Sequence, residues 1–232
     1  MIKLSRRSYA FILLCTFVLI FTNCKKNKDE EPLVITPTVN PVPYTVQVYL
    51  LTPNDQTFNA DYYKAARSTI LDLQAWYKTQ MDGKTFQLNP VVVDTLTGSH
   101  SSSWYTADNG EISNNSPSGF FNTKGNLKEL LGSKFDTTLY EYVVWVSVPF
   151  GDETIPRGIA VESSTNLDGL LGSGPNMYKG AAGHALGHAF GLPEVTPNPD
   201  GIMSNGWPHY PNCVLKPAEK DSLNASPFFK AL

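Results

Sequence analysis

The chain has 232 residues, of which 41% are hydrophobic and 17% are charged, and its formal net charge at pH 7 is −3. Residues 1–23 carry three of the 18 Lys and Arg residues and none of the 21 acids, so the rest of the chain has 15 basic against 21 acidic residues, a net charge of −6. Because nucleic acids attract basic surfaces, this balance disfavours nucleic-acid binding, and we expect no nucleic-acid partner.

Residues 1–23 have the features of a secretory signal peptide. A basic start precedes an apolar run over residues 9–21, which is shorter than the roughly 20 apolar residues of a membrane span. The sequence FTNC at residues 21–24 resembles a loose bacterial lipobox, which implies that Cys24 becomes the lipidated first residue of the mature protein. An uncleaved anchor with an incidental cysteine is the alternative. Both interpretations place the rest of the chain in the bacterial cell envelope, outside the cytoplasm and tethered to a membrane.

The remaining chain divides into a tether and one domain. Residues 24–43 are charged and then rich in Pro, Thr and Val, a composition that suits an extended tether. Residues 44–232 contain no second linker and no internal repeat, and a domain of that length can bury a sizeable core. Cys15 lies in the signal peptide and Cys24 would carry the lipid. Only Cys213 then remains in the mature chain, so an internal disulfide cannot form. We interpret Cys213 as a small buried apolar residue rather than a metal ligand, and we expect a monomer.

The first part of the domain predicts a strand, a helix and a second strand. Residues 44–51 alternate apolar and more polar side chains, as a strand does. Asn59 can cap a helix that extends through Gln80, because apolar residues recur there at three- and four-residue steps. A second strand is predicted over residues 85–94, interrupted by Pro90, which indicates an edge position or a bulge.

The middle of the domain combines an irregular stretch with a short helix and two strands. Residues 97–119 are rich in Ser, Asn and Gly, which predicts a surface excursion in which the lone His100 is solvated. A second helix is predicted around residues 127–131. Residues 140–148 are apolar almost throughout, as expected of a strand buried on both faces. Residues 158–162 predict a further, short strand.

A metal-binding helix is predicted over residues 178–190. Residues four apart in a helix lie on the same face, so His184 and His188 can hold one Zn²⁺ from a single turn. Gly191 favours the left-handed conformation that ends a helix, and the proline at position 193 prevents the helix from resuming. The chain therefore turns, which can bring Glu194 back toward the metal as a third ligand. Two packed core histidines are the alternative, but the joint pattern favours zinc.

The pattern His-x-x-x-His-x-x-Gly-x-x-ligand, followed by DGIMS at residues 200–204, resembles the metzincin zinc peptidases and their Met-turn, with Met203 as its methionine. This resemblance implies a zincin-like α+β fold: a twisted mixed sheet with packed helices, an active-site helix, the Met-turn and a C-terminal helix, which Pro217 can begin. It also implies Zn²⁺ as the cofactor and a peptide or protein substrate that lies extended beside the strand at residues 158–162. Tyr210 is the matching candidate for stabilising a developing oxyanion.

The chain departs from the metzincin pattern at two positions. Ala185 stands where metzincins carry the general-base glutamate, and Glu194 stands where they carry His or Asp as the third ligand. Because that general base is not a zinc ligand, Ala185 threatens catalysis, to which a positioned acid or base contributes roughly 10²–10⁴-fold, but leaves metal binding intact. Asp200 and His209 are the alternatives to Glu194 as the third ligand.

Three functions are compatible with these observations. The first is a membrane-anchored zinc metalloprotease whose peptide-bond hydrolysis is weak or lost. The second is a pseudoprotease that binds a peptide or protein. The third is a surface or glycan-binding lipoprotein without metal, which would account for the aromatic residues Trp104 and Trp207 but not for the histidine motif.

Overall fold

The computed structural model describes residues 42–108, 118–151 and 157–232. The predicted signal peptide, the predicted lipidation site at Cys24 and almost all of the predicted tether lie outside the described residues. Within the described ranges, none of the helices combines the length and the apolar character that crossing a membrane requires.

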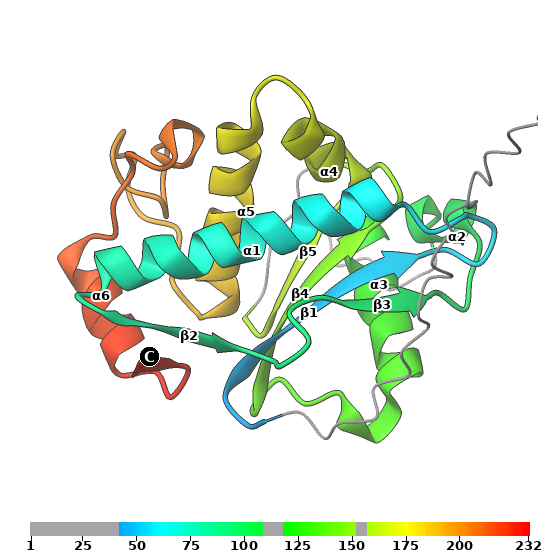
Figure 1. Cartoon of the computed structure of the whole chain (residues 1–232), viewed down its shortest axis with the longest axis horizontal. Coiled ribbons are helices and arrows are strands. Elements are labelled where there is room, and N and C mark those ends of the chain that lie inside the picture. The colour runs from blue at the N-terminus through cyan, green and yellow to red at the C-terminus, as the bar shows by residue number, and fades with distance from the viewer. Residues whose placement is uncertain (1–41, 109–117, 152–156) are drawn as a thin grey trace, which may run out of the picture. The chain divides into compact units, whose positions relative to one another are not determined.

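The described strands form a six-stranded mixed sheet (Figure 1). β1 (Thr45–Thr52) is central, and β4 (Tyr140–Val146) pairs with it in parallel along almost its whole length. β5 (Ile159–Glu162) pairs in parallel with β4 and ends the strand order β5-β4-β1-β2-β6. All seven residues of β4 are buried, which confirms the prediction of a strand covered on both faces.

The strand predicted over residues 85–94 is two strands. β2 (Lys84–Leu88) pairs in parallel with the start of β1, and β3 (Asp94–Thr97) pairs in parallel with its end. Pro90 lies between them, where a residue without an N–H cannot continue the ladder, so the predicted interruption is confirmed. The edge position that Pro90 also suggested is wrong for β2, because β2 has a strand on either side. Its second neighbour is β6 (Phe229–Ala231), which pairs with it in antiparallel and which the sequence did not predict.

Helices cover both faces of the sheet (Figure 1). α1 (Ala60–Gln80), α4 (Ser164–Leu171) and α5 (Pro175–Ala189) contribute to the core on one face. α2 (Ser102–Thr106) and α3 (Ser118–Leu131) contribute to the core on the other face. The 3-10 helices η1 (Gly132–Lys134) and η2 (Trp207–His209) and the final helix α6 (Pro217–Asn224) complete the domain.

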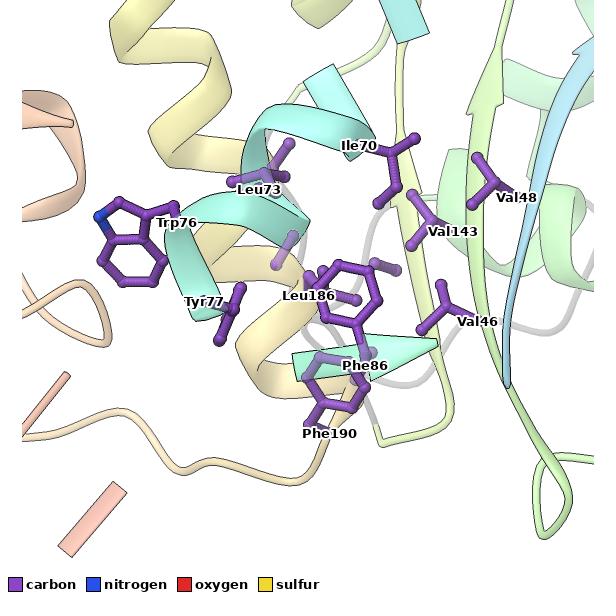
Figure 2. Packing of buried hydrophobic residues seen from close by; sticks show 14 of the residues in the cluster. Val46, Val48, Ile70, Leu73, Trp76, Tyr77, Phe86, Val143, Leu186 and Phe190 are labelled. Atoms are coloured by element: carbon purple, nitrogen blue, oxygen red, sulfur yellow. The ribbon is translucent and has the colours of Figure 1, made fainter. Parts of the chain in front are cut away.

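The alternation of β1 explains why the core has two halves. Val46, Val48 and Leu50 point to the face that carries α1 and α5, whereas Tyr49 and Leu51 point to the face that carries α2 and α3. Figure 2 shows the first half, in which side chains of the strands meet those of α1 and α5. α5, the helix with both histidines, is therefore part of the main core.

Two helix predictions are confirmed at their ends. Asn59 caps α1, since its Oδ1 accepts hydrogen bonds from the backbone N–H of Asp61 at 2.9 Å and of Tyr62 at 3.3 Å. α6 begins at Pro217, as predicted. α5 begins at Pro175, earlier than predicted, because proline suits the first helical turn.

The prediction of a surface excursion over residues 97–119 is wrong for the residues of this range that the structure describes. It contains α2 and the start of α3, and the Tyr105 side chain is fully buried. The Nδ2 of the buried Asn122 lies 3.0, 3.1 and 2.9 Å from the carbonyl oxygens of Trp104, Tyr105 and Ala107, and its two N–H groups hold the end of α2 against α3. α4 was not predicted either.

Glu141 lies in β4, and its carboxyl group is buried in the core. It is 2% exposed, and its Oε2 has no hydrogen-bond partner among the described residues. Burial raises the pKa of Glu141 to about 8, although the charge of Arg157 opposes the shift. The folded protein therefore holds this proton more tightly than the unfolded chain, in which the Glu pKa lies near its ordinary value of 4.5.

We predict that Glu141 lowers the stability of the protein as the pH rises from about 4.5 to about 8, because the unfolded chain loses the proton first. Glu141→Gln should remove this part of the decline, so the variant should gain roughly 2–4 kcal/mol over the wild type between pH 5 and pH 9. Urea denaturation at both pH values measures the difference. Parallel stability curves for the two proteins would contradict the assignment.

Candidate metal centre

From Gly180 onward, α5 is buried except at three positions, while its first residues are accessible on several sides. Met177 is exposed and Ala181, His184 and His188 are half-buried, and these four residues follow one another at helical spacing. The residues between His184 and His188 are buried. Both histidines therefore lie on one face of α5, as predicted, and solvent reaches that face.

Backbone carbonyls fix the orientation of both imidazole rings. His184 Nδ1 lies 2.7 Å from the carbonyl oxygen of Ile202, and His188 Nδ1 lies 2.9 Å from that of Leu192. A carbonyl oxygen only accepts, so each Nδ1 must carry the hydrogen. In the neutral rings, each Nε2 is then left with its lone pair free for a metal.

The two free lone pairs converge with a carboxylate. His184 Nε2 and His188 Nε2 lie 3.0 Å apart, and Glu194 Oε2 lies 3.3 Å from each of them. Tetrahedral zinc with ligands at 2.0–2.1 Å requires ligand atoms about 3.3–3.4 Å apart, so the three atoms fit three corners of a zinc site. Two imidazoles and one carboxylate also form a donor set that zinc uses in proteins.

The electrostatics favour the neutral form of His184. Burial lowers the pKa of His184, and the neighbouring His188 lowers it further, while the hydrogen bond to Ile202 and the charge of Glu194 oppose the shift. A neutral imidazole is the form that binds metal. The Glu194 side chain is 59% accessible.

The turn after α5 positions Glu194. Gly191 has φ +86°, in the region that glycine adopts most readily, and its N–H bonds to the His188 carbonyl at 2.8 Å. The N–H of Leu192 bonds to the Gly187 carbonyl at 3.0 Å, which closes the helix end. The helix thus ends where the sequence predicted.

Met203 packs against α5 at Gly187, the residue before His188. It is fully buried, and its Sδ occupies the place that a Cβ at position 187 would take, so only glycine lets the two segments approach this closely. The N–H of Val195 also bonds to the Met203 carbonyl at 3.1 Å, which ties the segment of Glu194 to that of Met203. The Ile202 carbonyl that holds His184 belongs to the same turn.

The other predicted site residues lie elsewhere. Asp200 and His209 are exposed and do not belong to the group of potential metal-binding residues found in the described part of the chain. Tyr210 is 7% exposed and its ring packs against Trp76 at 6.0 Å, so its role at the metal stays a prediction. Ala185 is 2% exposed and belongs to the core next to the histidines.

Two further sequence interpretations can be compared with the structure. Cys213 is buried and free, and burial raises the pKa of its thiol to about 11, which suits a core residue. His100 is not simply solvated, because it stacks on Trp104 at 3.7 Å and its Nε2 lies 2.9 Å from Glu129 Oε2. The groups that sequence reasoning missed are the carbonyls of Ile202 and Leu192, since any residue type supplies a carbonyl.

The fold is similar to that of OgpA from Akkermansia muciniphila. Two crystal structures of wild-type OgpA match with TM-scores of 0.59 and 0.58, each at 15% sequence identity over 87% of this chain. A structure of catalytically inactive OgpA in complex with an O-glycopeptide (glycodrosocin) substrate matches with a TM-score of 0.55 at 15% identity over 82% of this chain. The matches cover 66% and 62% of the OgpA chains.

These likenesses show a zincin-like α+β fold, as the sequence predicted. No protein-family model matches the chain. No curated protein matches its sequence either.

The geometry predicts how three substitutions affect zinc affinity. Glu194→Ala should weaken zinc binding on the order of 100-fold or more, because it removes one of three converging donors. His209→Ala and Asp200→Ala, which alter exposed residues outside this group, should leave the affinity unchanged. Competition with a chromophoric chelator measures all three. A larger loss for His209→Ala than for Glu194→Ala would mean that the turn is placed wrongly.

Proposed function

We propose that this protein is a zinc-binding, metalloprotease-like protein. It recognises a peptide and hydrolyses that peptide weakly or not at all. The observation that carries the proposal is the convergence of His184 Nε2, His188 Nε2 and Glu194 Oε2 within 3.3 Å of one another. The zincin-like fold supports it, since such a fold presents its metal on a helix like α5.

Zinc bound by three protein ligands acts as a Lewis acid, which polarises a carbonyl oxygen and lowers the pKa of water. His184, His188 and Glu194 would hold it, and the carbonyls of Ile202 and Leu192 would keep the imidazoles in the binding tautomer. Ala185 has no group that accepts or donates a proton. The chain therefore supplies metal binding without the general base that efficient peptide hydrolysis uses.

A peptide that carries a glycan is a candidate ligand. OgpA, whose fold this chain shares, has been crystallised with an O-glycopeptide substrate. On this basis we propose that the ligand is a peptide or glycopeptide. It would extend beside β5 at the edge of the sheet. If hydrolysis is absent, the same arrangement serves a pseudoprotease that binds its ligand without cleaving it.

We further propose that the protein is a lipoprotein of the cell envelope. The support is the signal-like segment of residues 1–23 with Cys24 behind it. The charged and Pro-rich residues 24–43 would hold the zinc domain away from the membrane.

The first test of the proposed function is metal content. Protein purified without chelator at neutral pH should contain about one equivalent of zinc, because the described residues contain one three-donor group. His184→Ala and His188→Ala should each abolish it. Atomic absorption spectroscopy measures the stoichiometry, and a wild type free of zinc would refute the proposal.

The second test restores the missing base. Ala185→Glu should leave the zinc content unchanged and raise peptide cleavage by roughly 10²–10⁴-fold, the usual contribution of a positioned general base. Ala185→Gln is the matched control, since its side chain has the same size and cannot take up the proton, and it should give no gain. Cleavage of a fluorogenic peptide mixture measures the rates.

Three outcomes of this second test have different meanings. A gain with glutamate alone supports a site that lacks only its base. Equal rates in the wild type and Ala185→Glu would identify the wild type as a working enzyme with another base. Zinc without cleavage in every form would favour the pseudoprotease.

A further inference from the structure

The part of α5 that carries the histidines is a weak helix by its sequence. It contains Gly180, Gly183 and Gly187, and glycine is one of the poorest helix formers. The turn from Gly183 to Gly187 includes His184 and ends one residue before His188. The separation of the two imidazoles therefore depends on contacts that stabilise this turn from outside the helix.

The Tyr77 hydroxyl of α1 makes such a contact. It donates a hydrogen bond to the Gly183 carbonyl oxygen at 3.0 Å. In an α-helix, a carbonyl oxygen also accepts the N–H of the residue four positions later, and its two lone pairs can serve both donors. A Cβ built on Gly187 would lie 3.4 Å from the same hydroxyl. The hydroxyl thus lies against both ends of the turn that carries His184.

The core fixes the direction of the Tyr77 hydroxyl. Tyr77 is fully buried in the cluster shown in Figure 2. Its ring centroid lies 5.7 Å from that of Phe86 in β2, 6.0 Å from that of Phe190 and 5.7 Å from that of Phe229 in β6. Burial raises the pKa of Tyr77, and the charge of Glu219 raises it further, so the hydroxyl keeps its proton and stays a donor. The sheet therefore holds a hydrogen-bond donor against α5.

We propose that Tyr77 is a positioning residue for the metal centre, whose hydroxyl holds the turn from Gly183 to Gly187 where the Nε2 atoms of His184 and His188 converge. Tyr77 acts through the helix backbone. This inference rests on the proposed zinc binding. It adds a residue that the local sequence motif does not contain, because Tyr77 lies 106 positions before Gly183 in the chain.

Tyr77→Phe tests this role, because it removes the hydroxyl and keeps the ring. The full chain is freed of zinc and titrated with zinc against a chromophoric chelator. Tyr77→Phe should bind zinc about tenfold more weakly than the wild type, the lower end of the loss seen when groups that orient metal ligands are removed. Co²⁺ can occupy the same donors, and its visible absorption reports how the ligands are arranged. The absorption of the Co²⁺-loaded variant should therefore differ from that of the wild type.

Tyr105→Phe is the matched control. Tyr105 is also fully buried, and its hydroxyl donates to Asn126 Oδ1 at 2.7 Å in the core on the other face of the sheet. Each substitution removes one buried hydroxyl bond, so each should lower the midpoint of urea unfolding. Only Tyr77→Phe should affect the metal. Tyr105→Phe should keep the wild-type Co²⁺ spectrum and a zinc affinity within about twofold of the wild type, because distant sites act independently.

The outcomes separate this inference from the proposed function. Tyr77→Phe protein with the zinc affinity or the Co²⁺ spectrum of the wild type would overturn the positioning role and leave zinc binding standing. An equal loss of affinity in Tyr105→Phe would overturn it too, since any loss of core stability would then weaken the site. A Tyr77→Phe chain that does not fold would assign the hydroxyl to the fold as a whole, with the same result. A wild type that binds no zinc would overturn both the inference and the proposed function.

Discussion

The candidate site depends on two hydrogen bonds from imidazole N–H groups to backbone carbonyls. Ile202 O holds His184 and Leu192 O holds His188, at 2.7 and 2.9 Å. These bonds determine which nitrogen of each ring keeps its lone pair, and the lone pairs then face each other across 3.0 Å. Both carbonyls lie C-terminal to α5, so the site exists only when the turn at Gly191 and the turn at Met203 are folded around the helix end.

The packing of α5 explains how this geometry is held. Tyr77 of α1 donates its hydroxyl to the Gly183 carbonyl at 3.0 Å, one residue before His184. Glycines at positions 183 and 187 let Leu73, Ile202 and Met203 approach the helix, since a Cβ at either position would crowd them. Because these glycines are small, α1 and the segment at residues 202–203 both pack directly against α5. The rings of His184 and His188 therefore have little freedom to move.

The convergence of His184, His188 and Glu194 was easier to predict from the sequence than β6 or α2, and the reason is distance along the chain. His184, His188, Gly191 and Glu194 lie within one helical turn and its cap, so local geometry places them together. β6 could not be predicted in this way, because Phe229–Ala231 is short and pairs with a strand far away in the chain. α2 was missed because its polar sequence suggests a loop, whereas in the fold the Asn122 amide of α3 holds the carbonyls at the end of α2 and the Tyr105 side chain is buried.

Metal binding and catalysis are separable in this chain on electrostatic grounds. With both Nδ1 atoms donating to carbonyls, neither neutral ring has an N–H to offer the other at Nε2, so two lone pairs and the Glu194 carboxylate repel one another. Burial makes protonation of His184 unfavourable, which leaves a bound cation as the better way to relieve this repulsion. None of these interactions involves Ala185, whose side chain is part of the core. An alanine at position 185 therefore leaves in place every group that would hold a metal.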